Sequence, residues 1–251
     1  LLIYFAVLPI KSNKTIRMKL RSIPSALLVA ATFSFSAAYA GKIQIKDGQT
    51  IGFLGDSITA AGARSGGYCN LFIQALKAEG ITAKPIYKGI GGHKSNQMLE
   101  RVDRDILQHK PDWMTLSCGV NDVWHGKNGV NLEDYKKNIT AIVDKAHAAG
   151  VRVLILTSTM IKEDQSGDLN QKLIPYNDFL RALAKQKKCL LADLNADMQE
   201  ALKTAPADRP KGKKLTGDGV HMNPHGNVMM ARGVAKALGF SDGQLAKIVT
   251  K

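Results

Sequence analysis

Five short apolar runs, each followed by a loop and an amphipathic segment, constrain the fold of this chain more than any other feature. They are expected to form strands at Thr50–Gly55, Lys84–Gly89, Trp113–Cys118, Val151–Ser158 and Cys189–Leu194. Several of these runs are almost wholly apolar, as strands buried on both faces are. Strands that alternate with helical segments are typical of an α/β fold. The sequence therefore predicts a three-layer α/β/α sandwich with about five parallel strands.

Six amphipathic segments lie between and after these runs and are expected to form helices. They are Tyr68–Glu79, Ser95–Leu107, Leu132–Ala149, Leu169–Lys187, Asp197–Lys203 and Pro224–Leu238. Gly80 and Gly150 each follow a helical pattern and precede a strand, a position that favours a residue in the left-handed conformation. The sequence of residues 41–251 contains no repeat, low-complexity tract or linker, so these residues are expected to form a single domain.

The segment that starts at Met18 has the pattern of a secretory signal peptide. Lys19 and Arg21 supply its positive end, residues 26–38 its apolar run, and Ala38-Tyr39-Ala40 a small-x-small cleavage site. Cleavage is expected after Ala40, which implies a periplasmic or secreted protein.

The alternative to a signal peptide is a membrane anchor over residues 23–40. Pro24 and the scattered Ser and Thr side chains make this stretch a poor membrane-spanning helix. No stable membrane anchor is therefore expected after cleavage. Residues 1–17 precede the methionine at which the signal pattern begins and are interpreted as an upstream leader.

The charge of the chain does not indicate a nucleic-acid-binding protein. The formal net charge of +14 falls to +9 when the five basic residues of 1–40 are set aside. The remaining positive charge is spread along the chain without interleaved aromatic residues, so nucleic acid is not an expected partner. One local basic run, which contains Arg209, Lys211, Lys213 and Lys214, is interpreted as a solvated loop rather than a polyanion site.

The cysteines and histidines do not indicate a disulfide scaffold or a metal site. Cys69, Cys118 and Cys189 cannot all pair within one chain and are too few for such a scaffold, although a pair among them stays open. The sequence has no Cys-x-x-Cys and no His-Glu-x-x-His pattern, so no metal or other cofactor is expected.

Polar clusters directly follow the first three predicted strands. They are Gly55-Asp56-Ser57, Gly89-Ile90-Gly91-Gly92 and Gly119-Val120-Asn121-Asp122. In an open parallel sheet, ligands bind outside the carboxyl ends of the strands, where the strand order reverses. With the order 2-1-3-4-5, the first and third strands are neighbours, and Ser57, Gly92 and Asn121 converge on one crevice.

These residues match the requirements of acyl transfer, which are a nucleophile, a base, an orienting group for the base, and donors to the developing oxyanion. Ser57 stands at a strand-to-helix turn, where its hydroxyl is exposed and its own N–H can face the oxyanion. Gly92 offers a second N–H without a side chain to block close approach. Asn121 offers a side-chain amide.

The base and its orienting carboxylate are expected in Asp218-Gly219-Val220-His221. A spacing of three residues on a turn brings the two side chains to one face, so Asp218 can hold one imidazole nitrogen while the other reaches Ser57. Pro224 begins a helix after this turn, with Asn223 as its expected N-cap.

The sequence resembles that of the SGNH/GDSL hydrolases in four blocks of residues. The four blocks Gly-Asp-Ser, a glycine cluster, Gly-x-Asn-Asp and Asp-x-x-His occur in that order between about Ile51 and Ala237. The resemblance implies a flavodoxin-like SGNH hydrolase fold and a serine esterase. It implies a triad of Ser57, His221 and Asp218, and an oxyanion hole formed by Ser57, Gly92 and Asn121.

The chain departs from the usual pattern of these blocks at four positions. The first block reads Gly-Asp-Ser-Ile, in which Ile58 is a conservative change after the nucleophile. Gly91 and His93 replace residues that are often polar or acidic around the oxyanion glycine, so the choice between Gly91 and Gly92 as donor stays open. Met222 stands where the family often has proline.

The sequence indicates the identity of the substrate less clearly than the type of reaction. His93, Trp124 and His125 are expected to bind substrate, with Lys94 and Asn96 beside them, and their polar and aromatic character suits a sugar ring. The expected activity is therefore that of a carbohydrate O-acetylesterase. A lipid or thioester acylhydrolase and a non-catalytic glycan-binding protein are the alternatives.

Individual residues also have simpler interpretations. Ser57 taken alone suits a helix N-cap, and Asp122 is interpreted as support for its loop. His225 is expected to be a surface residue rather than the base. The oligomeric state is left open by the sequence.

Overall fold

A computed structural model describes residues 42–206 and 210–250. The predicted signal segment, its cleavage site and Arg209 lie outside these residues. The described part contains a sheet of five strands in the order β2-β1-β3-β4-β5, and each strand is parallel to its neighbours. The strands are β1 (Thr50–Gly55), β2 (Lys84–Gly89), β3 (Trp113–Ser117), β4 (Arg152–Leu156) and β5 (Leu190–Ala192). The predicted sheet and its strand order are confirmed.

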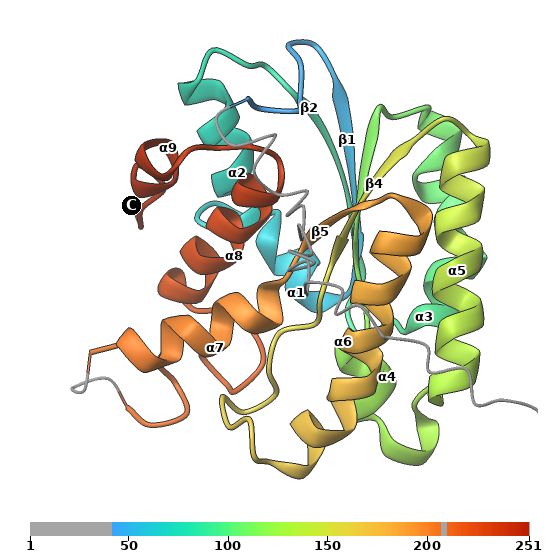
Figure 1. Cartoon of the computed structure of the whole chain (residues 1–251), viewed down its shortest axis with the longest axis vertical. Helices are drawn as coiled ribbons and strands as arrows, with labels where there is room; N and C mark the ends of the chain where they lie inside the picture. Colours follow the sequence, from blue (N-terminus) through green and yellow to red (C-terminus); the bar gives the residue numbers. More distant parts are fainter. Residues whose placement is uncertain (1–41, 207–209, 251) are drawn as a thin grey trace, which may run out of the picture. The chain divides into compact units, whose positions relative to one another are not determined.

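Helices cover both faces of the sheet, as expected for an α/β/α sandwich (Figure 1). One layer contains α1 (Ser57–Gly62), α2 (Tyr68–Ala78), α7 (Leu194–Thr204) and α8 (Pro224–Ala237). The other contains α3 (Ser95–Asp105), α4 (Val120–Trp124), α5 (Leu132–Ala148) and α6 (Asp168–Lys187). The helix α9 (Asp242–Ala246) packs against α8, and the 3₁₀ turns η1 (Leu107–His109) and η2 (Gly126–Asn128) follow α3 and α4.

The burial of each strand explains its sequence. All five residues of β3 are buried, and β1 is buried from Ile51 onward. The edge strands β2 and β5 are partly exposed, which is why β2 contains two lysines. The core between sheet and helices holds large side chains such as Phe53 and Phe72, which contact each other edge to face.

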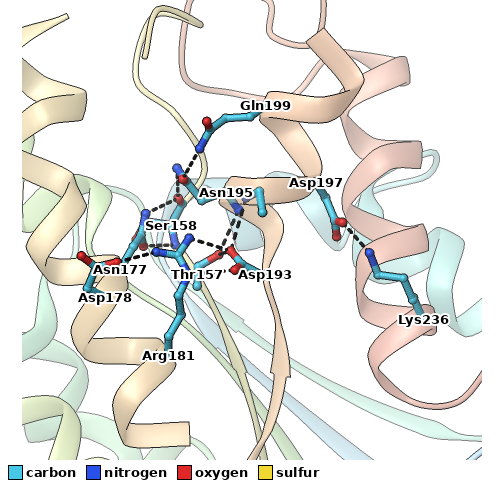
Figure 2. Close-up of polar contacts among 11 residues, drawn as sticks. Thr157, Ser158, Asn177, Asp178, Arg181, Asp193, Asn195, Asp197, Gln199 and Lys236 are labelled. Carbon is cyan, nitrogen blue, oxygen red and sulfur yellow. Dashed lines mark hydrogen bonds and ion pairs between the residues drawn. The ribbon is translucent and has the colours of Figure 1, made fainter. Parts of the chain in front are cut away.

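Three strands end earlier than the sequence predicts. β3 ends at Ser117 rather than Cys118, and β4 and β5 end where polar side chains beyond the strand bond to helices. β4 ends at Leu156 rather than Ser158: the Thr157 hydroxyl donates to Asp193 at 2.9 Å and the Ser158 N–H donates to Asn177 at 2.8 Å (Figure 2). β5 ends at Ala192 because Asp193 becomes the N-cap of α7 and accepts from the N–H of Ala196. The helix α7 therefore begins at Leu194, three residues earlier than predicted.

The residues predicted to end or cap helices do so in the structure. Gly80 and Gly150 have φ angles of +78° and +74°, the left-handed conformation expected after α2 and α5. Asn223 caps α8 by accepting from the N–H groups of His225 and Gly226. The short helices α1, α4 and α9 were not predicted, since five or six residues are too few to show a helical period.

None of the helices within residues 42–206 and 210–250 is long and apolar enough to cross a bilayer.

Candidate active site

Ser57 lies where the buried strand β1 ends and α1 begins. Asp56 is the N-cap of α1 and accepts from the Ile58 N–H at 2.9 Å. The first N–H groups of a helix have no partner within it, so the Ser57 N–H is available to a ligand. Burial raises the pKa of the Asp56 carboxyl to about 6, against the opposing effect of the Ile58 hydrogen bond.

The structure brings Ser57, His221 and Asp218 into one hydrogen-bonded chain. The Ser57 Oγ is 2.9 Å from His221 Nε2, and His221 Nδ1 is 2.6 Å from Asp218 Oδ2. Asp218 Oδ1 also accepts from the N–H groups of Val220 and His221 at 2.9 and 2.8 Å. Burial acts to raise the pKa of Asp218, but the hydrogen bonds from His221 and Val220 outweigh it and lower this pKa to about 2. Asp218 is therefore a carboxylate that accepts from the imidazole and from its own turn.

Gly91, Gly92 and Asn121 lie around the same serine. A methyl group placed on Gly91 would lie 3.8 Å from Ser57 Cβ, and Gly92 has a φ of +75°, which favours glycine. The Asn121 amide nitrogen donates to the His93 carbonyl at 3.1 Å and to Asp56 Oδ2 at 3.4 Å. The residues that follow β1, β2 and β3 thus lie close together, as the strand order predicts.

The residues predicted to bind substrate lie in different surroundings. Trp124 is 41% exposed and His125 is exposed beside it, whereas His93 is partly buried and its Nδ1 has no hydrogen-bond partner. Burial and the nearby Arg101 lower the pKa of His93. His225 is an exposed residue in the first turn of α8, in agreement with its expected surface position.

Two further polar residues predicted near the cleft help to shape the loops around it. The Lys94 ammonium donates to the Asn128 carbonyl at 2.7 Å and so joins the start of α3 to η2. Asn96 lines a hollow of about 320 Å³ together with Asn131, Asp134 and Asn138.

The sequence did not predict the contacts that two carboxylates near the site, Asp122 and Glu163, make in the structure. Asp122 accepts from the Ser95 N–H at 2.9 Å, so it ties α4 to α3 rather than only bracing its own loop. Glu163, in the loop after β4, accepts from the backbone of the segment that precedes Asp218. Nothing in its local sequence indicates that role, because its partners are more than fifty residues away.

A family model of the GDSL-like lipase/acylhydrolases matches residues 53–228, which contain Ser57, Asn121, Asp218 and His221. The chain belongs to this family. The resemblance drawn from the four sequence blocks is therefore confirmed, as are the fold and the expectation of an enzyme that hydrolyses carboxylic esters.

Relatives of this GDSL-family chain include named esterases. An acetylxylan esterase from Geobacillus stearothermophilus is 25% identical over 219 residues, which cover 79% of this chain and 97% of the relative. The crystal structure of an acetyl xylan esterase, AlAXEase, has 36% sequence identity and a TM-score of 0.68, and the match covers 74% of this chain and 97% of that one. Esterase TesA from Pseudomonas aeruginosa is 31% identical over 110 residues, which cover 43% of this chain and 53% of the relative.

All three cysteines are free thiols, and Cys69 and Cys118 are buried. In the portion of the chain that the structure describes, no three His, Cys, Asp or Glu residues are grouped in a way that could hold a metal ion.

Proposed function

We propose that this member of the GDSL family is an exported serine esterase that removes acetyl groups from carbohydrate. The observation that carries the proposal is the hydrogen-bonded chain from Ser57 through His221 to Asp218, with distances of 2.9 and 2.6 Å. A serine, a base and a carboxylate in this order are the arrangement that activates a hydroxyl for attack on an ester.

In the proposed first step, Ser57 Oγ attacks the ester carbonyl carbon while His221 Nε2 takes the hydroxyl proton. Asp218 fixes the tautomer by accepting from Nδ1, and its negative charge stabilises the imidazolium. The tetrahedral intermediate collapses as His221 gives the proton to the leaving sugar oxygen. Water, deprotonated by the same imidazole, then attacks the acetyl-serine, and acetate leaves as Ser57 regains its proton.

The negative charge that develops on the carbonyl oxygen requires donors in the crevice. The Ser57 N–H, the Gly92 N–H and the Asn121 amide are proposed to supply them. The contact between Asn121 Nδ2 and Asp56 is long, at 3.4 Å, so a strongly charged oxyanion competes well for this N–H. The shorter bond to the His93 carbonyl, at 3.1 Å, keeps the amide oriented during the reaction.

The preference for a sugar substrate rests on the surroundings of the serine and on the relatives. Trp124 is exposed at the end of α4, the helix that contains Asn121, where its ring can stack on a sugar face, and His125 lies next to it. Two relatives that are each matched over 97% of their own length are named acetylxylan esterases. Both observations favour an acetylated polysaccharide or oligosaccharide over a lipid.

Export is proposed from the pattern of residues 18–40 in the sequence, and it suits an enzyme that acts on external polysaccharide.

The test compares substrates and a covalent probe. Wild-type protein should release acetate from acetylated xylo-oligosaccharides, and a fluorophosphonate probe should label it but not Ser57→Ala. Faster hydrolysis of long-chain p-nitrophenyl esters or acyl thioesters than of the acetylated sugar would contradict the substrate. Equal labelling of wild type and Ser57→Ala would contradict the serine mechanism, and unlabelled wild type that still binds xylo-oligosaccharide would indicate a glycan-binding protein.

A further inference from the structure

Glu163 holds the backbone that leads into the Asp218–His221 turn. Its Oε1 accepts from the N–H groups of Leu215 and Thr216, at 2.8 and 2.6 Å, and from the Thr216 hydroxyl at 2.7 Å. Its Oε2 accepts from the Lys214 N–H at 2.8 Å. One carboxylate therefore satisfies four donors of three consecutive residues, and the last of these, Thr216, is fully buried.

The segment that Glu163 holds is directly joined to the turn that carries His221. Thr216 and Met222 form an antiparallel bridge, and the Gly217 N–H donates to the His221 carbonyl at 2.8 Å. The Asn223 N–H donates to the Leu215 carbonyl at 3.0 Å and so closes the base of the turn. The bridge consists of these two backbone hydrogen bonds, so a movement of residues 214–216 is passed to the backbone of His221 and Asn223 through them.

The loop that carries Glu163 is itself anchored to the sheet and to α6. The buried Asn170 accepts from the Ile161 N–H at 2.8 Å and donates to the Ile161 carbonyl at 2.6 Å. Closer to β4, Ser158 is held by Asn177 from α6 and by Asn195 from α7 (Figure 2). These contacts make the loop a fixed reference for the turn.

A second link from the same loop reaches the turn beside Asp218. The Lys162 N–H donates to the Gly219 carbonyl at 2.6 Å. Lys162 and Glu163 have φ angles of +62° and +51°, a left-handed conformation that is uncommon for residues other than glycine. This conformation directs the Lys162 N–H and the Glu163 carboxylate toward the turn. Two consecutive residues thus contact the turn before and within its Asp-x-x-His sequence.

We propose that Glu163 is a positioning residue that sets the place of His221 relative to Ser57. It touches neither the serine nor the imidazole and acts through residues 214–216. The inference rests on the proposed serine-esterase function, because it assigns Glu163 a role in aligning the base of that reaction.

A carboxylate suits this place better than an amide. With glutamine, one oxygen can still accept from Leu215 and Thr216, but the amide nitrogen then faces the Lys214 N–H, so two donors oppose each other. With alanine, the hydrogen bonds from all four donors to Glu163 are lost, and the Thr216 hydroxyl keeps only its long contact with the Gly212 carbonyl, at 3.4 Å. Glu163→Gln is therefore expected to retain most of the alignment, and Glu163→Ala little of it.

The experiment measures kcat, KM and thermal unfolding of Glu163→Ala and Glu163→Gln on p-nitrophenyl acetate. Glu133→Ala, which removes an exposed glutamate from α5, is the matched control. Glu163→Ala should lower kcat by about 10–100-fold with KM changed less than about threefold, because a misplacement of about 1 Å can cost about 10²-fold. Glu163→Gln should lower kcat by about 2–10-fold, as one lost hydrogen bond would. Glu133→Ala should match the wild type.

A spectroscopic measurement separates positioning from general stability. The proton shared by His221 and Asp218 should give a far-downfield ¹H NMR signal in substrate-free wild type, and the signal should move or broaden in the Glu163 variants but not in Glu133→Ala. Folded Glu163 variants with normal kcat and an unchanged signal would overturn the inference. If Glu163→Ala does not fold, Glu163→Gln decides: a lower unfolding temperature with unchanged kcat and signal would make the role purely structural. If the serine probe labels wild type normally, such a result rejects only this inference, whereas unlabelled wild type rejects the proposed function itself.

Discussion

Replacing Asp56 with asparagine should stabilise the protein relative to wild type, and this gain should grow as the pH rises from 4.5 to 8. The Asp56 side chain is almost fully buried, and burial raises its pKa from 3.8 to about 6. Between these two values the unfolded chain is ionised while the folded protein holds the proton. Folding is therefore penalised progressively as the pH rises through this window, and the penalty becomes constant once both states are ionised.

The size of this effect follows from linkage, in which one pKa unit corresponds to about 1.4 kcal/mol. The full penalty at pH 8 is about 3 kcal/mol, and about 2 kcal/mol of it develops between pH 4.5 and pH 8. Asparagine removes the titration but keeps the N-cap, because its oxygen can still accept from the Ile58 N–H. Its amide nitrogen opposes Asn121 Nδ2, which costs about 1 kcal/mol at either pH and cancels in the comparison.

The assay is urea unfolding of wild type and Asp56→Asn at both pH values, followed by circular dichroism. Asp242→Asn, which changes an exposed aspartate in the first turn of α9, is the control and should show the pH dependence of the wild type. Carboxylates that do not interact with Asp56 titrate alike in all three proteins and cancel in the difference, whereas the charge of Asp122, which raises the pKa of Asp56, is part of the effect. The same pH dependence in wild type and Asp56→Asn would refute the argument that burial of Asp56 opposes its ionisation.

Four further predictions follow from the proposed mechanism and from the sequence. Ser57→Ala and His221→Ala should each lower kcat by orders of magnitude and their combination should add little, whereas His225→Ala should be near normal on p-nitrophenyl acetate. A loss of turnover confined to His225→Ala would move the base to that residue. Asn121→Ala should lower kcat with little change in KM, a loss of about 3 kcal/mol of transition-state stabilisation, and a change in KM alone would argue against an oxyanion role. Activity should survive EDTA, so its loss and recovery with zinc or calcium would contradict a metal-free mechanism. Mass spectrometry of the exported protein should show Gly41 at its N-terminus, and retention of Met18 would contradict signal cleavage.

The sequence predicted the sheet because strand burial and strand sequence are directly coupled. An apolar run such as Trp113–Ser117 has no stable place except between two layers of helices, and it forms the fully buried β3. Gly80, Gly150 and Asn223 were also predictable, since helix ends depend on the conformation and side chain of one residue.

The clustering of Ser57, Gly92 and Asn121 was predictable for a different reason. Each follows a strand directly, and parallel strands place their carboxyl ends at the same edge of the sheet. Asp218 and His221 needed the family pattern as well, because their turn is far from the other three along the chain.

By itself the sequence determined the class of fold, the helix ends and the residues that could carry acyl-transfer chemistry, since these depend on local periodicity and on residue type. Only the tertiary structure decided that Asp56 is buried, that Asp122 ties α4 to α3 and that Glu163 holds the turn before Asp218. A carboxylate looks alike in sequence whether water or three backbone N–H groups and a hydroxyl surround it. Its pKa and its role depend on burial and on donors, and residues distant along the chain supply both only after the chain has folded.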